Sequence, residues 1–409
     1  MIKNILLIPI FLLLFSGIYA NSHYDIIVAK DGSGNYTSLT EAINNLPMYQ
    51  YQRCVIYIKN GIYEEKIRIE QNYVTIVGES RDSTIIRYSQ LRTDWQNNKD
   101  FIGPAVINIH ADDIILKNLT IENTQPQIGP HAFTIYGTGT RTIILNCKVT
   151  SKGGDTVSLW NYKSGMYYHS DCYFEGAVDF VCPRGWCFIR KSSFYEVKQT
   201  AAIWHAAPEN KNQKFVLLNC SFDGVEGFNL GRHHYEACFY LINCMFSRNM
   251  ANRPIYHEIS GDPSKDRPYF YGDRHYYHNC KKEGEVYKWY ADNMKINPDI
   301  VTPEWTFDKQ WDPESSEVPK VNQYKIDNKN LYLYFNSTIT VRGKLILKTS
   351  TGKILIFKKG EGRDILRFES EQPLNSKDLK NNLSVVSGQI LDTQASVKER
   401  VIADIIIIP

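Results

Sequence analysis

Two aspartates and a histidine are the residues best suited by type and spacing to perform chemistry. His131, Asp155 and Asp179 follow one another at intervals of 24 residues, and Arg232 comes about two intervals later. In a chain that coils with one turn per interval, such residues stack on one face at the spacing of parallel strands, about 4.8 Å. Two carboxylates this close cannot both ionise freely, so one acts as an acid and the other as a base or nucleophile.

An arginine beside one of the two carboxylates would keep that carboxylate ionised, and this is the role predicted for Arg232. Taken alone, each residue also has a simpler explanation. Asp155 follows two glycines and suits a turn, Asp179 suits a solvated loop, and Arg232 suits a surface ion pair. Their shared register favours a functional site over these separate explanations.

An internal repeat supports the coil that this register requires. An apolar residue, an Asn or a substitute, a small residue and a spaced apolar residue recur along the chain. The recurrences are Leu116–Ile121, Leu145–Val149, Ser170–Phe174, Arg190–Phe194, Leu218–Phe222 and Ile242–Phe246. Successive steps of 28, 25, 20, 28 and 24 residues are too uneven for a helical array, and the runs are short and rich in β-branched and aromatic residues. They predict a parallel β-helix, with a β-sandwich carrying chance Asn-Cys pairs as the alternative.

The repeat also changes the meaning of the nine cysteines. In a β-helix, one cysteine of each repeat would face the interior as a small apolar residue and need no disulfide partner. Cys147, Cys172, Cys220 and Cys244 are predicted to form this interior stack. Of the remaining five, Cys182 and Cys187 lie just after Asp179, where a local disulfide is the favoured hypothesis.

Metal binding is not expected from the sequence. The Cys182/Cys187 pair has no companion pair at the spacing of a zinc site. His275 and His278 stand three residues apart, but we predict that they lie in an exposed loop near the C-terminal edge of the β-helix. We therefore expect no metal and no cofactor.

Composition excludes several classes of protein. The chain has 409 residues, is 43% hydrophobic and 22% charged, and carries a formal net charge of +3. These values are typical of a globular protein, and no dense basic surface for nucleic acid is indicated. Lys3, the apolar run from Ile5 to Phe15 and a small residue at Ala20 predict a signal peptide over residues 1–20. No later stretch is long enough to span a membrane, so we expect export to the periplasm or the extracellular space.

A second boundary is predicted near residue 320. All tryptophans, cysteines and histidines precede it, and Asp312–Pro319 has the composition of a linker. The predicted β-helix domain thus covers residues 21–319, and a small all-β, sandwich-like domain covers residues 320–409. Without a tryptophan on which a sugar could stack, this last domain is interpreted as structural rather than carbohydrate-binding.

At these positions the chain resembles the pectin methylesterases, the right-handed β-helix esterases that remove methyl groups from homogalacturonan. The resemblance covers roughly residues 24–315, and its motifs are specific when taken together. Its motifs are residues 28–39, Gly61–Glu65, Val74–Gly78, Gly154-Asp155-Thr156, Val178–Val181, Leu230-Gly231-Arg232 and Trp305–Asp308. It implies that Asp179 is the nucleophile, that Asp155 is the general acid and base, and that Arg232 orients Asp179. It also accounts for the absence of a Gly-x-Ser-x-Gly motif.

The chain departs from the family pattern at the positions that contact substrate. His131 and Gly154 replace two glutamines that stabilise the oxyanion, and His233 and His234 replace a Pro-Trp pair. We expect His131 or a backbone amide to donate to the oxyanion instead, and Trp160 and Trp204 to supply the lost sugar stacking.

These changes favour a branched or decorated pectic polysaccharide or oligosaccharide as the substrate of a monomeric enzyme. Two other functions stay open. One is a β-helix pectate lyase or polygalacturonase, although the column interrupted by His131 offers no calcium-binding acid cluster. The other is a non-catalytic protein that binds pectic glycans, as the two missing glutamines suggest.

Overall fold

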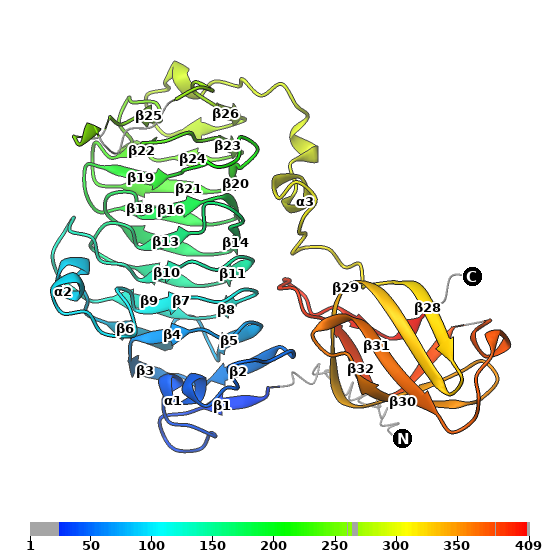
Figure 1. Cartoon of the computed structure of the whole chain (residues 1–409). Coiled ribbons are helices and arrows are strands. Elements are labelled where there is room, and N and C mark those ends of the chain that lie inside the picture. The colour runs from blue at the N-terminus through cyan, green and yellow to red at the C-terminus, as the bar shows by residue number, and fades with distance from the viewer. Residues whose placement is uncertain (1–23, 260, 264–268, 381, 407–409) are drawn as a thin grey trace, which may run out of the picture.

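A computed structural model describes residues 24–259, 261–263, 269–380 and 382–406. The predicted signal peptide, residues 1–20, lies outside these residues. Three parallel sheets stack along one axis, and an antiparallel sheet lies beside the first coils (Figure 1). The expected parallel β-helix with a C-terminal all-β region is therefore confirmed. Among the described residues, no helix has the length and apolarity to cross a membrane.

The three sheets of the β-helix contain ten, nine and eight strands and are called sheets A, B and C. Sheet A consists of β1 (Ile26–Val28), β2 (Cys54–Ile58), β5 (Val74–Gly78), β8 (Ile115–Lys117), β11 (Thr142–Leu145), β14 (Met166–Ser170), β17 (Trp186–Arg190), β20 (Phe215–Leu218), β23 (Phe239–Ile242) and β26 (His275–His278). Sheet B consists of β3 (Gly61–Glu64), β6 (Thr84–Tyr88), β9 (Thr120–Asn123), β12 (Lys148–Thr150), β15 (Tyr173–Gly176), β18 (Ser193–Glu196), β21 (Ser221–Gly224), β24 (Met245–Phe246) and β27 (Lys281–Lys282). Sheet C consists of β4 (Ile67–Ile69), β7 (Ile107–Ile109), β10 (Ile135–Gly137), β13 (Val157–Trp160), β16 (Val181–Arg184), β19 (Ala201–Trp204), β22 (Asn229–His233) and β25 (Tyr256–His257).

The Asn-like position of the repeat is a sharp turn from sheet A into sheet B. Its residues all have positive φ, a conformation that Asn tolerates better than most side chains. They are Asn118, Asn146, Asp171, Lys191, Asn219, Asn243 and Asn279. Neighbouring turns also bond to each other, since Asn146 Nδ2 donates to Asn118 Oδ1 at 3.0 Å and Asn279 Nδ2 to Asn243 Oδ1 at 2.8 Å. The turn explains why the repeat keeps its motif while the loops between coils vary in length.

The residue after each turn faces the interior, as predicted. Cys147, Cys172, Cys220 and Cys244 are buried in one apolar core with the strand residues of all three sheets. The next turn adds Cys280, whose Sγ lies 3.3 Å from the Leu241 carbonyl oxygen. All nine cysteines are free, so the predicted Cys182–Cys187 disulfide is wrong. The two thiols belong to different clusters: Cys187 packs in the main core, and Cys182 packs with Trp204.

The prediction of an exposed loop at His275 and His278 is also wrong. These residues begin and end β26, the last strand of sheet A. Tyr277 in this strand is only 2% exposed and belongs to the main core. The strand forms because Phe239 to Ile242 in β23 offers a free edge for parallel pairing.

Short helices lie in the connections between strands. They are α1 (Leu39–Asn44), α2 (Arg92–Asn97), α3 (Pro303–Thr306) and the 3-10 turns η2 (Lys288–Tyr290), η3 (Pro298–Ile300) and η4 (Ser376–Leu379). The backbone N–H of Arg92, the first residue of α2, donates to the His131 carbonyl at 2.9 Å, which fixes this helix beside sheet C.

The C-terminal region is a seven-stranded antiparallel sheet with its own apolar core. Its strands are β28 (Val321–Asp327), β29 (Asn330–Lys348), β30 (Ile354–Lys359), β31 (Arg363–Ser370), β32 (Leu383–Asp392), β33 (Val401–Ile402) and β34 (Asp404–Ile405). The segment after β32 contacts the β-helix, since Trp311 Nε1 donates to the Ala395 carbonyl at 2.8 Å and the Ala395 N–H donates to Asp113 at 2.9 Å.

Candidate active site

A single pocket on sheet C, of about 340 Å³, is lined by all seven predicted site residues. They are His131, Asp155, Trp160, Asp179, Trp204, Arg232 and His234. The pocket also contains side chains that the sequence did not indicate, among them Arg92 and Arg184. The structure thus brings the predicted residues together and adds positive charge to them.

The two aspartates occupy equivalent corners of successive coils. Asp155 precedes β13 and Asp179 precedes β16, and both have positive φ, 59° and 58°. The Asp155 N–H donates to the Val178 carbonyl at 3.1 Å, and the Asp179 N–H donates to the Ala201 carbonyl at 2.6 Å. Because Val157 pairs with Val181 in the sheet, the two corners stack in register. Both backbone amides are therefore already bonded and are not free to stabilise an oxyanion.

Arg232 is paired with Asp179 in the manner predicted. It lies on β22, two coils beyond Asp179, in register with Trp204. Its Nε donates to Asp179 Oδ1 at 2.9 Å and its Nη2 to Asp179 Oδ2 at 2.9 Å. Such a bidentate, charge-assisted pair fixes the plane of the carboxylate. Arg232 does not keep Asp179 fully ionised as predicted, because burial outweighs its effect on the pKa of Asp179.

The electrostatics of Asp179 balance two opposing effects. Burial raises the pKa of Asp179 to about 7, although the paired Arg232 acts to lower it. The charge of the nearby Asp155 is a smaller effect that also raises the pKa, and the value of about 7 includes it. Asp179 thus titrates close to neutral pH, so its nucleophilic form grows as the pH rises through 7.

His131 lies on the coil before Asp155, where it bridges to Gly154. Its side chain is 47% exposed, and its Nε2 lies 3.9 Å from Asp155 Oδ1. Asp155 itself is only 7% exposed and accepts a long bond from Ser158 Oγ at 3.5 Å. His131 can therefore donate toward a group bound over Asp155, while it makes no short bond to Asp155 itself.

Arg184 is the main site residue that sequence reasoning missed. Its guanidinium lies 4.2 Å from the ring centre of Trp160 and 4.7 Å from that of Trp204, between the two indoles. Its Nε donates to the Tyr162 hydroxyl at 2.9 Å. The available signal was the register that pairs Trp160 with Arg184 on adjacent strands, which a spacing of 24 residues would have given.

This arrangement changes the roles of the two tryptophans. Trp204 is 4% exposed, and its Nε1 donates to His234 Nδ1 at 2.8 Å. Trp160 is half-buried and also lies beside the Arg92 guanidinium, 5.6 Å from it. Both indoles therefore hold Arg184 by cation–π contact. Trp204 has no exposed ring face to offer to a sugar.

Comparison with known proteins places the chain within a family. The family described as Pectinesterase matches residues 25–238. Pectinesterase 31 of Arabidopsis thaliana is 24% identical over 301 residues, which cover 59% of this chain and 93% of that protein. Probable pectinesterase 56 of the same plant is 35% identical over 162 residues, which cover 39% of this chain and 54% of that protein.

Solved structures agree in fold. A pectin methylesterase in complex with a hexasaccharide superposes with a TM-score of 0.57 at 20% identity, covering 72% of this chain and 99% of that chain. Pectin methylesterase PemA from Erwinia chrysanthemi gives a TM-score of 0.56 at 20% identity, covering 71% of this chain and 99% of that chain. In both comparisons nearly the whole of the known structure is matched, so the unmatched part lies in the present chain.

Proposed function

The chain belongs to the pectinesterase family of carboxylic ester hydrolases, and on that premise we propose that it hydrolyses galacturonate methyl esters in pectin or a pectic oligosaccharide. The observation that carries the proposal is the bidentate bond from Arg232 to Asp179 in the same pocket as Asp155. An oriented carboxylate beside a second carboxyl group has the two functions that ester hydrolysis requires, a nucleophile and a proton donor.

In the proposed first step, an Asp179 carboxylate oxygen attacks the ester carbonyl carbon and forms a tetrahedral oxyanion. The bond to the methoxy oxygen then breaks, and Asp155 gives its proton to that oxygen, which releases methanol. Galacturonate is left joined to Asp179 as an acyl-enzyme. Arg232 acts throughout by holding the Asp179 carboxylate in plane for attack.

The second step hydrolyses the acyl-enzyme. Asp155, now ionised, takes a proton from water as the water oxygen attacks the acyl carbon. The bond to Asp179 breaks, which frees galacturonate and restores the Asp179 carboxylate and the Asp155 proton. Each step passes through an oxyanion, for which His131 and Arg184 are the proposed donors in place of the two glutamines of the family.

Charge in the pocket supports a substrate of acidic sugars. Arg92 and Arg184 both line it, and both are held against the Trp160 ring. Guanidinium groups bind carboxylates well, so unesterified galacturonates next to the reacting residue are the proposed partners of these arginines. The altered His131, Gly154 and His234 positions favour a branched or decorated fragment over plain homogalacturonan.

The experiment is methanol release from methylated pectin and from methylated oligogalacturonides, measured for the wild type and Asp179→Asn. We expect release by the wild type and a loss of at least about a thousandfold in the variant, which lacks the nucleophile. Asp82→Asn is the matched control, because Asp82 is an exposed partner of Arg81 outside the pocket. Equal release by wild type and Asp179→Asn on every substrate would refute the proposal.

A pectic-glycan-binding protein without activity is the second candidate, because two oxyanion donors of the family are absent. It predicts saturable binding of oligogalacturonides by both proteins with no methanol from either. Lyase or polygalacturonase action would instead shorten the polysaccharide without releasing methanol. We also propose that the protein is exported, on the basis of the predicted signal peptide. Export would bring it to pectin, which is found outside the cell.

A further inference from the structure

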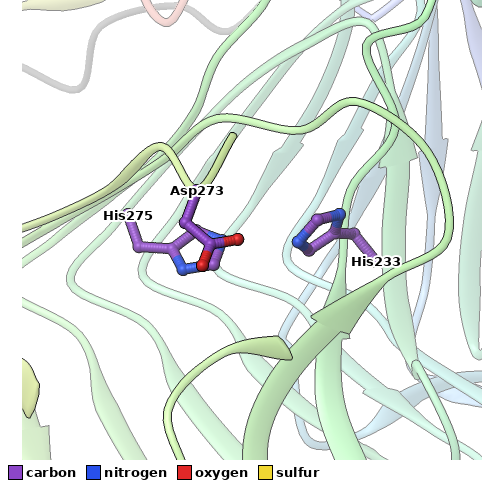
Figure 2. Close-up of side chains that lie close together, drawn as sticks. All are labelled: His233, Asp273 and His275. Carbon is purple, nitrogen blue, oxygen red and sulfur yellow. The ribbon is translucent and has the colours of Figure 1, made fainter. Parts of the chain in front are cut away.

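A second cluster of polar side chains lies at the far end of the β-helix. Figure 2 shows His233, Asp273 and His275 turned toward one another. One ligand-type atom of each lies within 4.8 Å of the corresponding atom of the other two. His233 ends β22 of sheet C and His275 begins β26 of sheet A, so the cluster joins two sheets and the segment before β26.

The hydrogen bonds of His233 fix which of its nitrogens is free. Its Nδ1 lies 2.8 Å from the Tyr235 carbonyl oxygen. A carbonyl only accepts, so Nδ1 carries the proton and Nε2 presents its lone pair. A metal-binding histidine is commonly held in this way, with the second nitrogen bonded to a backbone carbonyl.

The free nitrogens are buried as well as unpaired. Within the described part of the chain, Nε2 of His233 and Nε2 of His275 have no hydrogen-bond partner, and His233 is fully buried. A buried polar atom without a partner is costly, and these two nitrogens belong to one cluster.

Asp273 supplies the third group from a different direction. It is exposed, and its Oδ1 accepts a bond from the Tyr269 hydroxyl at 2.7 Å, which leaves its other oxygen for a ligand. The Tyr269 ring also packs on His233, with ring centres 5.5 Å apart. The same tyrosine therefore positions two members of the cluster.

We propose that His233, Asp273 and His275 bind a zinc ion, with water as the fourth ligand. Two imidazole nitrogens and one carboxylate oxygen are ligands that zinc prefers, at about 2.0–2.2 Å. Tetrahedral geometry would bring the ligand atoms to about 3.4 Å from one another. Small rotations of Asp273 and His275, the two less buried side chains, would close the remaining gap.

The ion would act as a cross-link. It would tie the segment from Tyr269 to His275 onto the end of β22, next to Arg232 and His234 of the pocket. The cluster itself lies outside the pocket lining, so the site is separate from the residues of the proposed esterase chemistry.

Titration with zinc chloride alone tests the proposal on the full chain after EDTA treatment and dialysis. Isothermal calorimetry should give one site per chain, and Asp273→Asn and His275→Gln should each weaken it at least tenfold. His278→Gln is the matched control, because His278 lies on the same strand and faces Asp292 at 3.4 Å instead. It should leave the affinity unchanged.

Thermal unfolding supplies a second measurement. At one zinc concentration, zinc should raise the Tm of the wild type and of His278→Gln equally, and that of Asp273→Asn by less. Asp273 is exposed, so its variant should fold, as circular dichroism without zinc will show. The proposal is overturned if the wild type binds no zinc, or if the two site variants bind it as tightly as the wild type does.

Discussion

Replacing Arg232 with glutamine should move the pH dependence of the enzyme rather than only lower its rate. Arg232 makes two bonds of 2.9 Å to Asp179, and the pKa of Asp179 is about 7 with this partner in place. Burial is the larger effect and would remain in Arg232→Gln. The variant would therefore keep the cost of burying the carboxylate and lose the charge that opposes it.

The size of the shift follows from the geometry. At an effective dielectric constant of about 20, unit charges about 4 Å apart attract by about 4 kcal/mol. Measured effects of an adjacent arginine on an aspartate are about one to three pKa units. A shift of about two units, or ~2.7 kcal/mol, would lower the ionised fraction of Asp179 at pH 7 from about a half to about 1%.

The assay is kcat/KM for methanol release between pH 5 and 10. The wild type should gain activity as the pH rises through about 7, because that is where Asp179 ionises. Arg232→Gln should be about fiftyfold less active at pH 7 and should recover toward high pH, with its midpoint raised by about two units. Arg232→Lys keeps a charge and should shift the midpoint by less.

A matched control removes an arginine ion pair elsewhere. Arg190, at the end of β17 in sheet A, pairs with Glu314, so Arg190→Gln should leave the midpoint in place. If Arg232→Gln loses activity equally at every pH and keeps the wild-type midpoint, Arg232 does not control the ionisation of Asp179. The reasoning from burial and pairing would then be wrong.

Three further outcomes follow from the same structure. His131→Ala should lower kcat by about a hundredfold with little change in KM if His131 donates to the oxyanion, and an unchanged kcat would assign that role to another donor. Because the folded state holds the Asp179 proton up to about pH 7, against an ordinary value near 3.8, its contribution to stability is complete below about pH 4 and is lost as the pH rises to 7. Urea unfolding should therefore show wild-type stability falling relative to Asp179→Asn across that window, by at most about 1.4 kcal/mol per pH unit, and parallel curves would contradict the raised pKa. Since all nine cysteines are free, iodoacetamide in denaturant without reductant should add nine labels per chain, and seven labels would restore a disulfide.

The repeat made most of the fold predictable, because its residue types answer local physical needs. Asn146 and Asn219 stand where the backbone turns with positive φ, and Cys147 and Cys220 stand where a small residue must face the interior. These needs recur at every coil, so the pattern is visible without knowing the loops. Cys280 escaped the pattern because it follows Cys244 by 36 residues, against steps of 20 to 28 between the recurrences.

The acid pair was predictable for the same reason, whereas the cluster of His233, Asp273 and His275 was not. Asp155 and Asp179 occupy one corner of adjacent coils, so their separation in sequence equals one coil. His233 and His275 come from different sheets, and β23, β24 and β25 lie between them in the sequence. No fixed sequence interval corresponds to their approach, and only the paths of β22 and β26 bring them together.

The pocket differs from the family pattern in its hydrogen-bond donors, and Arg184 can account for the difference. Two amide donors are missing, and the residues expected to stack on sugar hold a guanidinium instead. An arginine held between two rings keeps its charge while buried, and its N–H groups point from a fixed position. Such a group can stabilise an oxyanion or bind the carboxylate of a neighbouring sugar, both of which are negative. Arg184 therefore offers a charged donor in a pocket that lacks the two neutral ones, and the enzyme would depend on acidic sugars next to the ester more than a pocket built from glutamines does.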